Sequence, residues 1–174
     1  MRPPIPAACG GRYLAARAIK LGQMPEELTP LDAIEEPTWR ALARFFVVAP
    51  RLLDEDLQRG ASMSLSAYTV LLHLSEAPGR TLRITELAKR AYLSGSRTTR
   101  LVDELIAGRL VTKERNAADG RGFDVTLTDD GLAALQRAYP VHLRSVRSRV
   151  LDHIDRSTLG CFSTAMIAIA ESFE

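Results

Sequence analysis

The sequence predicts a mainly α-helical chain with one small β hairpin after its middle. Apolar residues recur at spacings of three and four, as expected of helices with one buried face, over residues 39–59, 67–76, 84–107 and 129–173. Two short β-like runs, 110–115 and 123–127, flank a segment of turn-forming residues, which is the pattern of a hairpin. The length of 174 residues suits one domain with an extension.

The first long helix is expected over residues 39–59. Thr38 is the candidate cap at its start, and Gly60 ends it. Pro50 lies inside the apolar stripe and removes one backbone donor while clashing with the preceding turn. It therefore predicts either a kink or two shorter helices.

The next helix is expected over residues 67–76, with Ser64 and Ser66 both offering caps. A turn follows, and residues 81–83 are expected to form one short strand.

Residues 84–107 predict a helix, a tight turn and a second helix. The turn falls at residues 92–95, so Ser94 or Ser96 can cap the second helix, and Gly108 ends it. In the hairpin that follows, the residues expected to face inward are Val111, Val125 and Leu127.

Positive charge is concentrated in this central region. Residues 79–122 hold ten Lys and Arg against five Asp and Glu, a local net charge of about +5, whereas the whole chain has a net charge of +2. A local positive surface on a nearly neutral protein is what a module facing phosphate groups needs.

The last helices begin with Thr128, Asp129 and Asp130, a capping residue and two acids suited to the positive end of a helix dipole. Pro140 predicts a bend, and residues 155–157 turn the chain into a short final helix that is strongly apolar on one side. The first and last helices together carry more apolar surface than one small lobe can cover. A two-fold homodimer is the economical way to bury it.

The runs ITELAKRAYLSGSRTTRLVDELIAGRLV and NAADGRGFDVTLTDDG resemble the winged helix-turn-helix of the MarR family of bacterial transcriptional regulators. The resemblance extends over about residues 39–171. It implies a winged helix-turn-helix with N- and C-terminal dimerisation helices that binds a pseudo-palindromic DNA operator as a homodimer. We expect a repressor, with a small aromatic or anionic molecule as the class of effector that releases it.

The implied organisation has an N-terminal extension at residues 1–35 and a single domain at 36–174. Within that domain, residues 61–128 form the DNA-binding lobe, and residues 38–60 and 129–174 form the dimerisation helices. Residues 1–23 are expected to be a flexible, disordered tail, or the product of a misplaced start, with Met24 as the alternative start. The other interpretation is a short extra helix over residues 13–21 that adds to the dimer interface.

The second helix of the helix-turn-helix is the candidate recognition helix, and the hairpin is the candidate wing. The residues expected to contact DNA are Ser94, Ser96, Arg97, Thr98, Thr99 and Arg100 in the helix, Lys113 and Arg115 in the hairpin strands, and Asp119 and Arg121 at the wing tip. Either arginine of the helix can be the one that reads a base. The alternatives are a solvated helix face in a protein-interaction module and a wing tip with a solvated arginine.

The effector pocket is expected to include Phe46, Tyr68, His73 and His142, although each of these also suits a plain core position. The histidines have no ligand spacing, Cys161 suits a packing role, and Cys9 lies in the extension, so we expect no metal and no cofactor. The sequence shows no phosphate loop and no catalytic phrasing, so an enzyme is not expected. No apolar run reaches membrane-spanning length, and we expect a cytoplasmic, nucleoid-associated protein.

Overall fold

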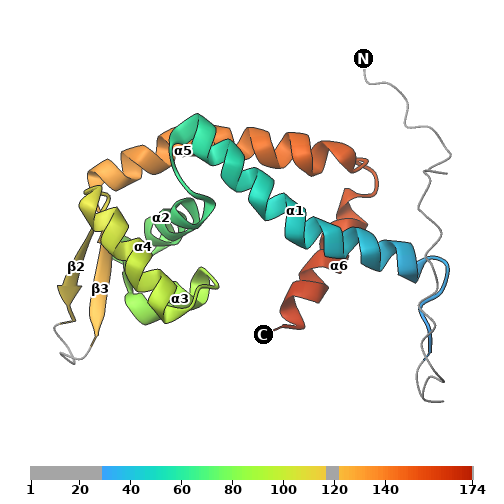
Figure 1. The fold of residues 1–174 in the computed structure, drawn as a ribbon, viewed down its shortest axis with the longest axis horizontal. Coiled ribbons are helices and arrows are strands. Elements are labelled where there is room, and N and C mark those ends of the chain that lie inside the picture. Colours follow the sequence, from blue (N-terminus) through green and yellow to red (C-terminus); the bar gives the residue numbers. More distant parts are fainter. Residues whose placement is uncertain (1–28, 117–121, 174) are drawn as a thin grey trace. The chain divides into compact units, whose positions relative to one another are not determined.

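The computed structural model describes residues 29–116 and 122–173 (Figure 1). In chain order the elements are α1 (Glu35–Ala61), α2 (Leu65–Glu76), the 3-10 turn η1 (Pro78–Arg80), β1 (Thr81–Arg83), α3 (Ile84–Arg90), α4 (Gly95–Ala107), β2 (Val111–Arg115), β3 (Phe123–Leu127), α5 (Asp129–Arg149), the 3-10 turn η2 (Leu151–His153) and α6 (Leu159–Glu171). The predicted fold class is confirmed. Two compact units divide within α1, between Val48 and Ala49. Cys9, Asp119, Arg121 and the helix expected over residues 13–21 lie outside the described residues.

The first helix starts four residues earlier than predicted, and Thr38 is not its cap. The Oδ1 atom of Asp32 accepts hydrogen bonds from the backbone N–H groups of Ile34 at 2.6 Å and Glu35 at 2.8 Å. The Glu35 carboxylate returns the contact by accepting from the Asp32 N–H at 2.9 Å. These bonds satisfy donors that a helix start leaves free, and they lower the pKa of Asp32. Thr38 already lies in the helix and donates its hydroxyl to the Ile34 carbonyl.

Neither internal proline divides its helix. Pro50 lies within the continuous α1, so the alternative of two shorter helices is wrong, and Pro140 lies within the continuous α5. Gly60 does not end α1 but sits in its last turn, where an added Cβ would lie 2.7 Å from a methyl group of Val141 on α5. The close approach of the two helices therefore explains this glycine.

The core of the 49–174 unit lies where α2, α3 and α4 pack against the sheet and the start of α5 (Figure 1). The three strands are antiparallel in the order β1-β3-β2, so β1, the short strand expected over residues 81–83, pairs with β3 of the hairpin. Val111, Val125 and Leu127 are buried, which confirms the predicted inward face of the hairpin. The other fully buried large apolar side chains are Leu57, Val70, Leu71, Leu74, Leu87 and Val102.

The helix caps decide where the lobe's elements begin. Ser64, rather than Ser66, caps α2 by accepting from the Ala67 N–H at 3.1 Å. Ser94, rather than Ser96, caps α4 by accepting from the Arg97 N–H. Thr128 caps α5 as predicted, because its hydroxyl accepts from the Gly131 N–H at 2.9 Å.

The C-terminal end of α4 differs in one detail from the prediction. Gly108 caps the C-terminus of α4 directly after Ala107, with φ −77°, whereas the left-handed residue is Arg109, with φ 59°. Helices often end on a left-handed glycine, and here the glycine sits one position too early to fill that role.

A polar clamp joins α1 to α5, and it consists of Asp56, Arg149 and Ser145. The Asp56 carboxylate accepts from Nε and Nη2 of Arg149 at 2.6 and 2.9 Å and from the Ser145 hydroxyl. The Arg59 Nη2 atom also donates to the Asp56 Oδ1 atom, at 2.5 Å. These hydrogen bonds, above all those from Arg149, hold the pKa of Asp56 well below its usual range.

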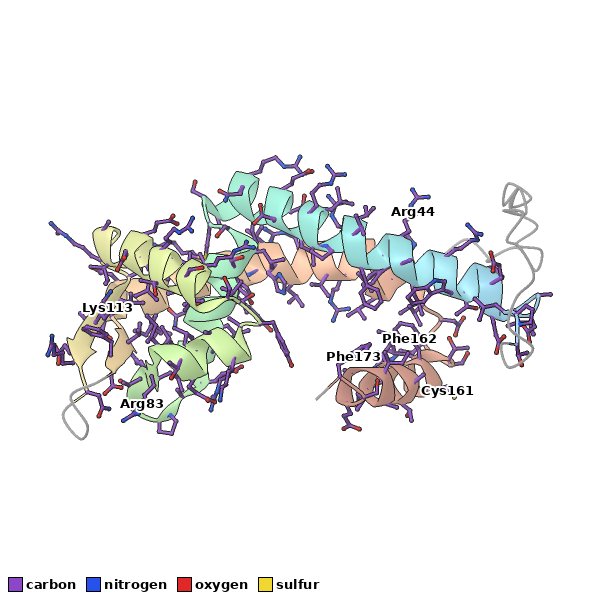
Figure 2. All side chains as sticks on the ribbon, turned by 60° about the horizontal axis from the view of Figure 1, so that its bottom comes forward. Arg44, Arg83, Lys113, Cys161, Phe162 and Phe173 are labelled. Atoms are coloured by element: carbon purple, nitrogen blue, oxygen red, sulfur yellow. The ribbon has the colours of Figure 1, made fainter. Side chains whose placement is uncertain are left out.

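The final helix, α6, has no buried residue in the described structure. Its exposed large apolar side chains include Phe162, Ile167 and Ile169, with Phe173 just past its end at 81 % exposure. Figure 2 shows Phe162 and Phe173 projecting from the same side of α6. Helix α6 is therefore fully formed, but its apolar side is not buried by any of the described residues.

Candidate nucleic-acid interface

The N-terminal end of α4 presents an exposed polar surface. Ser94 lies before the helix and Ser96, Arg97, Thr99 and Arg100 within it, and all five are exposed. The first turn of a helix has free N–H groups and a partial positive charge, so this end attracts anions. Cationic side chains and hydroxyl donors therefore converge at one helix end.

Thr98 does not belong to that surface, which corrects the prediction. Its side chain is 0 % exposed, and its hydroxyl donates to the Ser94 carbonyl at 3.0 Å. The reason is helical spacing: Thr98 stands three and four residues before the buried Leu101 and Val102 and so continues their stripe. A threonine there cannot reach DNA.

The two arginines of α4 differ in their surroundings. The Arg97 Nη2 donates to the Ser66 hydroxyl on α2 at 3.2 Å, so the guanidinium is directed across the gap between the helices. Arg100 has no hydrogen bond or ion pair with any residue that the structure describes. Both border a hollow of about 360 Å³ beside α4. Its lining residues are Asp54, Ser64, Ser66, Arg97, Arg100, Leu101 and Glu104.

Sequence reasoning missed the role of Ser66. It was a candidate cap because it stands near the start of α2, but that position is taken by Ser64. The bond to Arg97 spans 31 positions of sequence, so no local pattern could have indicated it.

Lys113 is engaged within the lobe. Its ammonium pairs with Asp103 of α4 at 2.8 Å and lies 5.4 Å from the centre of the Phe123 ring. The side chain is only 22 % exposed, and Figure 2 shows it on the sheet side of the lobe. It therefore fastens the hairpin to α4, which makes it a weaker candidate for a DNA contact than predicted. Arg115, at the end of β2, is exposed.

The base of the hairpin is held by a chain of polar contacts that the sequence did not indicate. The Arg83 Nη2 of β1 donates to the Asn116 side chain at 3.1 Å, and the Asn116 amide donates to Asp124 at 2.8 Å. The Asn116 N–H also donates to the Gly122 carbonyl. Because Arg83 stands opposite Asp124 in the strand register, sheet pairing brings these three side chains together. They fix the direction in which the hairpin leaves the lobe.

Of the four predicted effector-pocket residues, the structure brings two together. The rings of Tyr68 on α2 and His142 on α5 lie 4.4 Å apart between centroids. Burial raises the pKa of the Tyr68 phenol and lowers that of the His142 imidazole. His73 is half-buried, and Phe46 is exposed, with its ring 5.9 Å from that of Phe45.

Tyr68 is buried, at 3 % exposure, which suits the core position that was the alternative interpretation. The His142 Nδ1 atom is buried and has no hydrogen-bond partner in the described structure. None of the four residues borders the hollow beside α4, nor a second hollow of about 410 Å³ along α1 and α5. The second hollow is lined by Asp56, Arg59, Gly60, Val141, Arg144, Ser145 and Ser148.

Within residues 29–116 and 122–173, no group of three or more His, Cys, Asp or Glu side chains is arranged to hold a metal ion. Cys161 is an exposed free thiol on α6 in the single chain, so its expected packing role stays a prediction. None of the described helices is both long enough and apolar enough to cross a membrane.

Comparison with known proteins gives consistent matches. A model of the MarR family matches residues 61–122. A MarR family transcriptional regulator from Streptomyces coelicolor, solved in complex with DNA, is 34 % identical, with a TM-score of 0.77 over 83 % of this chain and 94 % of that one. AbsC, another MarR family regulator of that organism, is 28 % identical, with a TM-score of 0.76 over 84 % of this chain and 98 % of AbsC.

A further relative is the HTH-type transcriptional repressor YetL of Bacillus subtilis, which is 28 % identical over 96 residues. That match covers 55 % of this chain and 58 % of YetL, so the chain spans little more than half of this curated relative.

Proposed function

The chain belongs to the MarR family of transcriptional regulators, and we propose that it binds a pseudo-palindromic DNA operator as a homodimer and acts as a repressor. The similar regulator from Streptomyces coelicolor is in complex with DNA, and YetL is named a repressor. Both statements support the proposal by similarity.

The exposed N-terminal end of α4 is the single observation that carries this proposal. An α-helix fits the major groove, and its first residues then reach base edges. Arg100 is the best candidate for reading a base, because within the described structure no protein group holds its guanidinium. Arg97 is directed by Ser66. The serine and threonine hydroxyls of the same end are suitable phosphate donors.

The direct test is fluorescence anisotropy with DNA from upstream of the chain's own gene, against a scrambled duplex, at two salt concentrations. Salt-sensitive binding that prefers the native duplex is the expected result, because phosphate contacts release counterions. Equally weak binding to both duplexes would show that the operator does not lie in the tested upstream DNA. Absence of binding at low salt would favour a protein-interaction module.

Arg100→Ala should weaken operator binding by roughly 1–3 kcal/mol if the guanidinium makes a bidentate base contact. The matched control is Arg137→Ala, which removes another exposed positive charge, on α5 rather than on α4. Binding that falls equally on operator and scrambled DNA would identify Arg100 as a phosphate contact only. Equal losses for both variants would show a general charge effect.

Homodimerisation is supported by the apolar side of α6, none of whose residues is buried. Exposed Trp39, Phe45 and Phe46 give α1 a similar surface in the other unit. An apolar helix face of this kind needs a partner, and a second copy supplies an identical face. Phe162→Asp should yield a monomer by sedimentation velocity and lose operator binding while keeping its helix content. A dimer of unchanged affinity would exclude α6 as the interface.

Release by a small molecule completes the proposal. Its support is limited to His142, whose buried Nδ1 lacks a partner beside the Tyr68 ring. A polar group in that state is costly unless something pairs with it. Phenolic acids should release the operator from the wild type but not from His142→Phe; equal release from both would place the effector elsewhere.

A further inference from the structure

The turn between α3 and α4 contains a tyrosine where the backbone favours glycine. Tyr92 has φ 52°, in the left-handed region. Its N–H donates to the Lys89 carbonyl at 3.1 Å, and the N–H of Leu93 donates to the Ala88 carbonyl at 2.9 Å. This pair of bonds is the Schellman ending of a helix, in which the left-handed position is most often glycine.

A bulky residue in the left-handed region costs stability, because its Cβ crowds the backbone. Ser62, Arg80 and Arg109 also have left-handed φ values, of 50°, 55° and 59°. Ser62 is small, and the Arg80 guanidinium has a partner within the chain, Asp129, at 2.9 Å. Among these four residues Tyr92 alone carries an aromatic side chain, whose contacts must offset the cost of the backbone.

No contact of the Tyr92 side chain within the described structure offsets that backbone cost. The Tyr92 side chain is 88 % exposed, the largest exposed fraction among the large apolar and aromatic residues described. Its hydroxyl makes no hydrogen bond to any residue in the described ranges. The fold thus holds a strained backbone for a side chain that contributes nothing to its packing, a combination that points to a contact outside the chain.

The neighbours of Tyr92 indicate the chemistry of that contact. It stands two residues before Ser94, which caps α4, and it follows the exposed Lys89 at the end of α3, where Arg90 is paired with Glu86 at 2.9 Å. The turn is thus flanked by the exposed ammonium of Lys89 on one side and by the anion-attracting helix start on the other. We infer that Tyr92 contacts the DNA backbone beside the groove entered by α4, with its hydroxyl donating to a phosphate oxygen and its ring lying against the adjacent sugar. This inference rests on the proposed function.

A neutral phosphate contact leaves a signature that distinguishes it from the arginines. Tyrosine displaces no condensed cation, so its loss lowers affinity without changing the slope of log K against log salt. An arginine or lysine that neutralises a phosphate reduces that slope by about one when it is removed. Because backbone contacts carry no sequence information, operator and scrambled DNA should be affected alike.

The experiment compares Tyr92→Gly, Tyr92→Phe and the control Ser62→Gly in thermal melting and in anisotropy on both duplexes. Tyr92→Gly should melt about 2–4 °C higher than wild type, because glycine relieves the left-handed strain. The same variant should bind both duplexes about five-fold more weakly, the value of one neutral hydrogen bond, with an unchanged salt slope. Tyr92→Phe should lose a similar factor without the rise in melting temperature. Ser62→Gly should melt higher but bind like wild type.

A more stable Tyr92→Gly that binds both duplexes as tightly as wild type overturns the inference and leaves the proposed function intact. A reduced salt slope would also overturn it, because the loss would then reflect disturbed cation contacts. If wild type itself binds no DNA, the proposed function fails first. A tyrosine that remained equally open to nitration by tetranitromethane with and without operator, as mapped by mass spectrometry, would likewise exclude the contact.

Discussion

Gly131 at the start of α5 is a position where one methyl group should disrupt the lobe. A Cβ added there would lie 2.1 Å from the Leu110 carbonyl oxygen and 2.7 Å from a methyl group of Leu127. That carbonyl oxygen accepts the Thr128 N–H at 3.1 Å, and the Thr128 hydroxyl lies 3.0 Å from it. The junction between the hairpin and α5 therefore depends on a residue without a side chain.

The size of the effect follows from what must move. A carbon atom cannot stay 2.1 Å from a backbone oxygen, so the Leu110 carbonyl must shift and weaken its bonds to Thr128. Each lost hydrogen bond costs about 1 kcal/mol, and overpacking a core costs roughly 1–3 kcal/mol. The higher helix propensity of alanine offsets up to about 1 kcal/mol of this loss in stability. Gly131→Ala should thus lower the free energy of unfolding by roughly 2–4 kcal/mol.

Urea unfolding followed by circular dichroism measures this, with two other glycines as graded controls. Gly60→Ala would meet a flexible Val141 side chain at 2.7 Å, so its cost should be smaller. Gly160→Ala has no atom within 4 Å of the new Cβ and should be neutral or slightly stabilising. If Gly131→Ala unfolded at the same urea concentration as wild type, the described packing of Leu110 against α5 would be wrong.

Two further predictions use single polar contacts. Ser66→Ala should leave stability unchanged but narrow the preference for operator over scrambled DNA in anisotropy, because Arg97 loses the hydroxyl that directs it; an unchanged preference would show that the bond is incidental. Asp56→Asn should unfold at lower urea concentration than wild type at pH 7, with the gap narrowing below about pH 4. Because the pKa of Asp56 is lower in the folded than in the unfolded state, its charged carboxylate stabilises the fold above the unfolded-state pKa, and this stabilisation is lost as pH falls. A difference between the two unfolding midpoints that did not change with pH would contradict the clamp.

The local elements of this fold could be predicted from the sequence because their causes are local. Spacings of three and four fix the buried sides of α2, α4 and α5, and side-chain caps mark the starts of α4 and α5. The same periodicity would have removed Thr98 from the DNA-contact set. That prediction failed because residue type, a hydroxyl on a recognition helix, was given more weight than position on the helix.

Other features depend on pairs that only the tertiary fold brings together. Arg149 and Asp56 are 93 positions apart, and Arg97 and Ser66 are 31 apart. Separations of this size match neither the periodicity of a helix nor that of a strand, so no sequence pattern indicates these contacts. The left-handed conformation of Tyr92 could not be predicted either. Sequence rules place glycine at the left-handed position of such a turn, and Gly95, three residues later, was the glycine available in the predicted turn.

Helix α5 connects the proposed DNA-binding lobe to the C-terminal half of α1, and it is fastened at both ends. At its start, Thr128 and Gly131 join it to the Leu110 end of the hairpin. At its end, Arg149 is held by Asp56 of α1. A continuous helix of 21 residues between these points is about 30 Å long and resists bending in a way that a loop does not. In a two-fold dimer, the separation of the recognition helices would thus be set by α5, so one half-site spacing should be strongly preferred over others.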